Sequence, residues 1–188
     1  MSKSTRALVA AVFLSAAFGG ATTAGSSQAG TQPVTFFELE STAPTSWTSV
    51  EASSSVRLLQ MTVPGGGAES AAEMVVFFFG VGQGGNVPDN VVRWRSQFTG
   101  PDGAPVDVQM STFEAGGMPI TVAELSGTYR RAVGGTLAEP VPDQTLVAAV
   151  VETDRGSLFI QLHGPSATVA EHREAFDAFL RGLRPAGS

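Results

Sequence analysis

The six consecutive residues Met74-Val75-Val76-Phe77-Phe78-Phe79 are all apolar, and this run decides the fold. A strand with one face in water alternates apolar and polar side chains, whereas a strand buried on both faces is apolar throughout. We therefore expect residues 73–79 to form a strand in the interior of a sheet.

Turn residues and alternating patterns on both sides of this run predict further strands. Residues 56–63 end at Pro64 and three glycines, and residues 106–111 alternate apolar with polar side chains. Thr153-Asp154-Arg155-Gly156 is typical of a hairpin turn between two apolar runs. The expected strands besides 73–79 are residues 34–40, 56–63, 106–111, 119–129, 146–152 and 158–163.

A first helix is expected after the glycine-rich segment that follows residue 79. Val87, Val91, Trp94 and Phe98 recur at spacings of four, three and four residues, which forms one apolar stripe on a helix. Pro88 suits the first turn of such a helix. We expect this stripe to face the sheet.

A second helix is expected over residues 166–183, because its apolar residues share one helical face. Ser166 or Thr168 is expected to cap its N-terminus, and Pro185 is expected to stop it. The shared face consists of Val169, His172, Phe176, Phe179, Leu180 and Leu183.

The order of strands, helix, strands and helix, with short links, favours antiparallel pairing. Residues 41–55 are rich in Ser and Thr, and we expect a loop there that Trp47 pins to the core. The expected fold class is α+β, with one antiparallel sheet of about six or seven strands flanked by helices. Residues 30–188 are expected to form a single globular domain, since the chain has 188 residues.

The first 29 residues have the pattern of a secretory signal peptide. Lys3 and Arg6 precede a mostly apolar run over residues 7–18, and small residues follow at Thr22/Ala24 and Ser27/Ala29. Twelve residues are too short to cross the roughly 30 Å hydrocarbon core of a membrane. We expect cleavage and export to the periplasm or the cell exterior; the alternative is an uncleaved N-terminal anchor.

The charge of the chain argues against a nucleic acid as its partner. The chain has 11 basic and 17 acidic residues, and loss of residues 1–29 removes Lys3 and Arg6, which leaves a net charge of −8. Nucleic-acid binding needs clustered basic residues. The chain has no Cys, so thiol chemistry, disulfides and a lipid-modified cysteine are excluded as well.

The segment Gly80-Val81-Gly82-Gln83-Gly84-Gly85 matches the dinucleotide-binding pattern G-x-G-x-x-G. A dinucleotide site also needs the third Gly in the first turn of the helix and a following parallel strand with an acidic residue at its tip, whereas Val87-Pro88 delays the helix and Asp107 lies in mid-strand. We interpret the segment as a flexible connection from strand to helix; the alternative is anion binding by its free N–H groups. No cofactor is expected.

No assembled reactive set is visible in the sequence. His163 and His172 lie close enough in the chain to meet across a turn, but no third metal ligand has matching spacing. We expect His172 to be a packed, hydrogen-bonded core residue. There is no G-x-S-x-G elbow, so no catalytic residue and no metal ligand is assigned.

The segment around Trp94 is the candidate surface for binding a partner. Arg93 and Gln97 are one helical turn apart, on the side opposite the apolar stripe. We expect them to lie beside the glycine-rich segment 80–85, which we call the glycine loop. The candidate partner-binding residues are Arg93, Gln97, Gly82, Gln83, Gly84 and Gly85.

The order of these features resembles a known group of proteins. Trp47 in a loop, the strand at 56–64, the apolar strand, the glycine loop and the helix with Arg93-Trp94 are similar to exported bacterial proteins that have a Mog1/PsbP-like fold. The resemblance implies an antiparallel sheet flanked by helices. It also implies an accessory or interaction protein without catalytic residues.

The leading functional hypothesis is an exported, non-enzymatic accessory or binding protein, whose partner is a protein or a small ligand. A second hypothesis is a small periplasmic hydrolase whose site assembles from distant residues, such as His163 with a Ser or an Asp. A third hypothesis is a structural component of the cell envelope.

Overall fold

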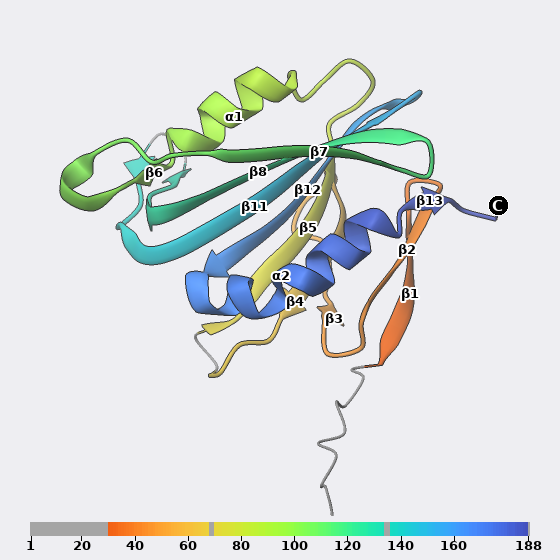
Figure 1. The fold of residues 1–188 in the computed structure, drawn as a ribbon, viewed down its shortest axis with the longest axis horizontal. Coiled ribbons are helices and arrows are strands. Elements are labelled where there is room, and N and C mark those ends of the chain that lie inside the picture. Colours follow the sequence, from red (N-terminus) through yellow and green to blue (C-terminus); the bar gives the residue numbers. More distant parts are fainter. Residues whose placement is uncertain (1–29, 68–69, 134–135, 188) are drawn as a thin grey trace, which may run out of the picture.

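A computed structural model describes residues 30–67, 70–133 and 136–187 of the chain, and for residues 132, 133, 136 and 137 it describes the backbone alone. The expected signal peptide at residues 1–29 lies outside these described residues. Two helices pack on opposite faces of an antiparallel sheet, so the expected α+β class is confirmed (Figure 1).

The main sheet has eight strands, and every pairing in it is antiparallel. Its order is β3 (Thr48–Ser49), β4 (Arg57–Val63), β5 (Ala72–Phe78), β12 (Gly156–Pro165), β11 (Val141–Thr153), β8 (Met118–Tyr129) and β6 (Phe98–Thr99), with β7 (Gln109–Ala115) also paired to β8. The apolar run of β5 lies between β4 and β12, which confirms the expected interior strand. The predicted hairpin is β11 and β12.

A smaller sheet of three strands stands beside the main one. It consists of β1 (Thr31–Phe36), β2 (Leu39–Pro44) and β13 (Arg184–Pro185). The expectation of one strand over residues 34–40 is wrong, because the chain turns at Phe37 and Glu38, where φ is 46° and 62°. A further short ladder joins β9 (Ala132–Val133) to β10 (Thr136–Leu137), and η2 (Pro101–Gly103) is a single 3-10 turn.

The expectation of a loop over residues 41–55 is wrong in part, because the end of β2 and the whole of β3 lie within this range. Trp47 does anchor this segment to the core, as expected, since its side chain is only 1% exposed. Its Nε1 donates a 3.1 Å hydrogen bond to Nδ1 of His172, whose Nε2 is 2.8 Å from the carbonyl oxygen of Pro64. His172 is therefore hydrogen-bonded, as expected, but it is half-buried at the edge of the core and does not belong to the core itself.

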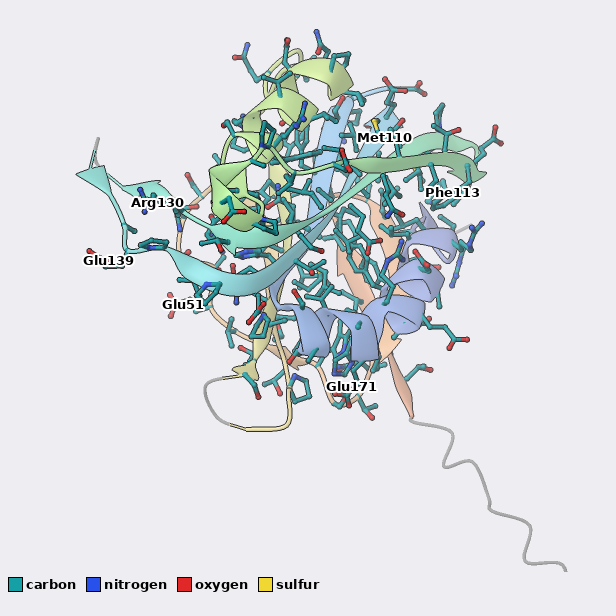
Figure 2. The ribbon with its side chains drawn as sticks, turned by 60° about the vertical axis from the view of Figure 1, so that its left-hand side comes forward. Glu51, Met110, Phe113, Arg130, Glu139 and Glu171 are labelled. Atoms are coloured by element: carbon teal, nitrogen blue, oxygen red, sulfur yellow. The ribbon has the colours of Figure 1, made fainter. Side chains whose placement is uncertain are left out.

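Helix α2 (Ser166–Arg181) covers one face of the sheet with its apolar side chains. This core contains Val76, Val122, Val147, Ile160, Leu162, Val169, Phe176, Phe179 and Leu180, among other residues. At its edge, Phe113 of β7 packs against α2, and the Arg181 guanidinium lies 4.4 Å from the Phe113 ring centroid (Figure 2).

The expected caps of α2 are wrong. Pro165 occupies the capping position, and no side chain caps the helix. The Ser166 hydroxyl accepts a 2.8 Å hydrogen bond from Thr145, and the Thr168 hydroxyl donates a 2.6 Å bond to the carbonyl of Ser70. Both hydroxyls therefore form hydrogen bonds with residues distant in the sequence and do not cap the helix.

Helix α1 (Val87–Arg95) lies on the opposite face of the sheet (Figure 1). Trp94 is 3% exposed, and Val87 and Val91 pack beside it, so the part of the expected apolar stripe that lies on α1 faces the sheet. Contrary to expectation, Phe98, also 3% exposed, is not helical, because α1 ends at Arg95 and Phe98 begins β6. Their partners are Val106, Ala123, Leu125, Leu146, Ala148, Val150 and Phe159. Nine helical residues span only about 14 Å, so α1 leaves part of this face uncovered.

The strand expected at residues 106–111 begins later, at Gln109. Val106 is 5% exposed and belongs to the core beneath α1. Its carbonyl accepts a 2.8 Å hydrogen bond from Nε of Arg95. Packing and hydrogen bonding against α1 thus hold this residue outside the ladder of β7 and β8.

Candidate functional site

Strands β5 and β12 supply the part of the sheet face that α1 leaves uncovered. Side chains alternate along a strand, so Met74 and Val76 join the core under α2 while Glu73, Val75 and Phe77 point to the other face. In the antiparallel register His163 pairs with Glu73, Gln161 with Val75 and Phe159 with Phe77. Polar and aromatic groups are therefore placed side by side.

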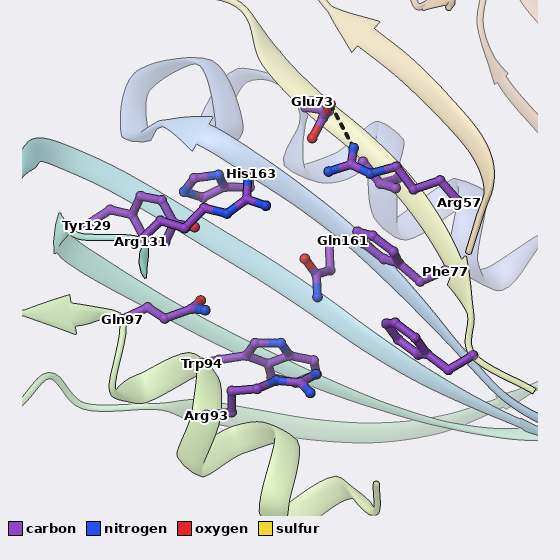
Figure 3. Close-up of a pocket in the computed structure, with 12 residues that line it drawn as sticks. Arg57, Glu73, Phe77, Arg93, Trp94, Gln97, Tyr129, Arg131, Gln161 and His163 are labelled. Carbon is purple, nitrogen blue, oxygen red and sulfur yellow. Dashed lines mark hydrogen bonds and ion pairs between the residues drawn. The ribbon is translucent and has the colours of Figure 1, made fainter. Parts of the chain in front are cut away.

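These strands and α1 enclose a cavity of about 220 Å³, which we call the sheet-face cavity. Figure 3 shows Gln161 near its centre, with Tyr129, Arg131 and His163 on one side and Phe77 and Arg57 on the other. The lining residues are Arg57, Glu73, Val75, Phe77, Phe79, Arg93, Trp94, Gln97, Tyr129, Arg131, Gln161 and His163.

Three arginines and one carboxylate line this cavity. Glu73 is already engaged, because its Oε1 is 3.1 Å from Nη1 of Arg57 and accepts a 2.6 Å hydrogen bond from Gln60. The Arg57 guanidinium also lies 5.1 Å from the Phe77 ring centroid. Arg93 and Arg131 form no ion pair within the described chain, so the cavity carries an excess of positive charge.

Arg93 and Gln97, which were predicted from the sequence, both line the sheet-face cavity. An Arg93 amino group donates to Oδ1 of Asn90. Nδ2 of Asn90 in turn donates to the carbonyl oxygens of Gly84, at 2.8 Å, and Asn86, at 2.9 Å. Asn90 is 1% exposed and thus connects Arg93 to the glycine loop.

The other four predicted residues, Gly82, Gln83, Gly84 and Gly85, are not among the residues that line the cavity. The loop holds α1 in place instead. At Gly84 φ is 91°, and a Cβ atom there would lie 2.5 Å from a ring carbon of Phe159. Only glycine fits this close approach between the loop and the sheet.

Burial and nearby charge perturb two titratable groups at one end of the cavity. Burial, followed by the positive charge of Arg131, lowers the pKa of His163 to about 4, so its imidazole is neutral at pH 7. Its ring lies 4.3 Å from that of Tyr129 and 6.1 Å from that of Phe98, measured between centroids. Burial is also the main cause that raises the pKa of Tyr129.

The structure places the two histidines on opposite faces of the sheet, so the meeting across a turn that their spacing allowed does not occur. His163 contacts aromatic rings of the core under α1, whereas His172 bonds to Trp47 on the α2 side. Nε2 of His163 is buried without a hydrogen-bond partner in the described chain. None of the residues that line the cavity is a Ser or an Asp.

Several polar groups of the cavity lack partners in the protein. Within the described residues, the side chains of Arg131, Gln97 and Gln161 and the indole Nε1 of Trp94 make no hydrogen bond. These groups offer donors and acceptors that converge on one small volume. Such convergence of polar groups among aromatic walls is the usual character of a ligand site.

Most of this site was not predicted from the sequence, which pointed only to Arg93, Gln97 and, for a hydrolase, His163. Arg57, Glu73 and Arg131 come from segments distant from Gln161 and His163 on β12, and only the register of β4, β5 and β12 brings several of them together. One signal was present in the sequence. Gln161 and His163 are polar residues at alternate positions of an otherwise apolar strand. Their spacing indicates that one face of this strand is not completely buried in the core.

No helix in the part of the chain that the structure describes is long and apolar enough to cross a membrane. No family model matches the sequence, and no curated protein matches it.

Solved structures do match the chain. The cyanobacterial PsbP, CyanoP, from Synechocystis sp. PCC 6803 has a TM-score of 0.52 and 13% identity over 86% of this chain and 95% of that one. LpqN, which is involved in cell envelope biogenesis of Mycobacterium tuberculosis, has a TM-score of 0.48 and 15% identity over 82% and 90%. A putative regulator of unknown function, PA94 from Pseudomonas aeruginosa, has a TM-score of 0.47 and 15% identity over 84% and 99%.

At these identities the likeness concerns the fold. Eight antiparallel strands with a helix on each face agree with the structure of CyanoP. The chain has a Mog1/PsbP-like fold, as its sequence resemblance implied.

Proposed function

We propose that this chain is an exported, non-enzymatic binding protein that holds a small ligand in the sheet-face cavity. The observation that carries the proposal is the set of unpartnered polar groups, on Arg131, Gln97, Gln161 and Trp94, around one cavity with aromatic walls. Polar groups of this kind fix the orientation of a ligand, and the aromatic walls supply buried contact area.

The size of the cavity restricts the ligand. Its volume of about 220 Å³ is below the range of roughly 300–1,000 Å³ that is usual for drug-sized molecules. A compact metabolite fits this space. A long peptide or an extended lipid does not.

The chemistry of the lining favours binding over catalysis. The carboxylate of Glu73 is neutralised by Arg57, and Nε2 of His163 is buried without a partner that would orient it. A general base must lie within hydrogen-bond reach of the proton that it removes, and a nucleophile needs such a base beside it. No Ser or Asp of the lining stands beside His163 to complete the hydrolytic set.

Export is part of the proposal, and it rests on the sequence of residues 1–29. A basic start, a short apolar run and small residues are the signals that a signal peptidase requires. The remaining chain, with a net charge of −8, would act in the periplasm or outside the cell.

The test is to recover the ligand from protein exported by its own cells. The purified protein is denatured, and released small molecules are compared by mass spectrometry with those from a Gln161→Trp variant, in which an indole fills the cavity. We expect a molecule that the original chain releases and the variant does not. Equal release from both proteins, or none from either, would contradict the proposal.

A further inference from the structure

We propose that the ligand of the sheet-face cavity is a compact aromatic oxyanion, that is, a carboxylate or a phosphate attached to a flat ring. This inference rests on the proposed function and names the chemical class of its ligand. Three independent features of the cavity point to this class: its charge, its walls and its neutral polar groups.

The charge of the cavity is the first feature. Glu73 and Arg57 compensate each other in an ion pair at 3.1 Å, while Arg93 and Arg131 have no acidic partner among the described residues. The whole chain carries six more acidic than basic residues, so this positive site is not explained by composition. Guanidinium groups bind carboxylates and phosphates through two parallel hydrogen bonds, which makes an oxyanion their natural ligand.

The walls of the cavity are the second feature. Four aromatic residues line it, and the rings of Phe77 and Phe79 are nearly parallel, with 5.9 Å between centroids and 5° between planes. Phe79 is 38% exposed, although it follows a strand whose other apolar residues are mostly buried. A flat ring stacked on these faces would cover this exposed surface.

The neutral polar groups are the third feature. Gln97 and Gln161 add amide donors and acceptors on two sides of the cavity, and Nε1 of Trp94 adds a donor. Figure 3 shows Gln161 between the side that holds Arg131 and the side that holds Phe77. A ligand whose oxyanion meets the arginines and whose ring meets Phe77 would lie across Gln161.

Four probes separate the charge of the ligand from its ring. Benzoate and phenyl phosphate carry both features, benzamide keeps the ring without the charge, and acetate keeps the charge without the ring. Isothermal titration at low salt compares their affinities, because added salt screens exposed charges. We expect the two aromatic anions to bind about tenfold or more tightly than benzamide and acetate. The stronger of the two anions identifies the carboxylate or the phosphate as the source.

Substitution of the cavity arginines tests whether the anionic probes bind in the sheet-face cavity. Arg93→Gln and Arg131→Gln should each weaken benzoate or phenyl phosphate binding about tenfold, because each removes a charged donor. Arg130→Gln is the matched control, since Arg130 is exposed, adjacent in sequence and absent from the cavity lining (Figure 2). Thermal melts confirm that all three variants fold.

The outcomes distinguish this inference from the proposed function. Benzamide binding as tightly as benzoate, with both weakened by Gln161→Trp, would overturn the oxyanion and leave the cavity as a ligand site. Binding that Arg130→Gln weakens as much as Arg131→Gln would overturn the assignment to the cavity. If no probe binds, the inference is wrong, and ligand recovery from exported protein decides the proposed function by itself.

Discussion

Trp94 belongs both to the core and to the candidate site. Its side chain belongs to the same buried cluster as Phe98 and Phe159, and the residue also lines the sheet-face cavity, where its Nε1 has no partner in the described chain. Arg93 precedes it in sequence but is exposed on α1. Trp94 thus contributes to both the core and the cavity, whereas Arg93 contributes to the cavity and little to the core.

Substitution of Trp94 should therefore destabilise the fold much more than substitution of Arg93. Trp94→Ala should lower the free energy of unfolding by about 3–5 kcal/mol, because it leaves a large void in the core. Arg93→Ala should lower it by about 1 kcal/mol or less, because an exposed arginine contributes little to folding. Urea unfolding of both variants measures the difference. A Trp94→Ala protein as stable as the original chain would show that the indole is not a core residue.

The buried imidazole of His163 predicts a dependence of stability on pH. Its pKa is about 4 in the folded chain, against about 6.5 in an unfolded one, because burial and Arg131 disfavour the charged form. As the pH falls, His163 therefore takes up a proton at a higher pH in the unfolded chain than in the folded chain. The stability that neutral His163 maintains is complete above about pH 6.5 and is lost as the pH falls towards 4.

His163→Gln isolates this effect, because the carboxylates that titrate in the same range are present in both proteins. Between pH 7 and pH 4.5 the original chain should lose about 2 kcal/mol more of its free energy of unfolding than the variant. Tyr129, Arg131 and Glu73 are the other titratable groups around this side chain, and the variant leaves them unchanged. Equal losses in the two proteins would contradict a buried neutral histidine.

At the scale of elements, the glycine loop sets the position of α1. Gly84→Ala should lower the free energy of unfolding by about 2–4 kcal/mol, because it adds both strain at positive φ and a collision with Phe159. Gly82→Ala is the control, since φ there is also positive, at 69°, but no atom lies within 4 Å of the added Cβ. It should cost only the strain, about 1–2 kcal/mol. Thermal melts that give equal losses would show that Gly84 does not pack on the sheet.

Elements with strong local patterns could be predicted from the sequence, and those set by distant partners could not. Six apolar residues in a row identified β5, and the stripe that ends at Phe98 identified the buried face of α1. The turn at Phe37 and Glu38 carries no glycine or asparagine to signal its positive φ angles. The capping pattern of α2 failed because Thr168 bonds to Ser70, 98 residues away.

The candidate site was predictable to the same limited extent. Helical spacing predicted that Arg93 and Gln97 share one face; Arg93 lies on α1, Gln97 follows the end of the helix, and both line the cavity. Arg57, Glu73 and Gln161 meet only through the register of three strands, which no local pattern specifies.

At the scale of the whole molecule, the proposed function requires that the chain is exported. Mass spectrometry of the exported protein should give an N-terminus between Gly25 and Thr31, because small residues suitable for cleavage follow the apolar run. This range ends where β1 begins, so cleavage there would leave the described fold complete. Recovery of an intact Met1 in the membrane fraction would instead support an uncleaved anchor.

We expect the α1 face of the sheet to bind a small aromatic oxyanion, and the two tryptophans of the chain test this claim in one measurement. Trp94 lines the sheet-face cavity, whereas Trp47 is buried on the α2 side and bonded to His172. The measurement follows the two indole N–H signals in a proton–nitrogen NMR spectrum, and the Trp94→Phe variant assigns them. Addition of benzoate should shift the Trp94 signal in a saturable way and leave the Trp47 signal in place. A Trp94 signal that does not move, or equal movement of both, would contradict the claim.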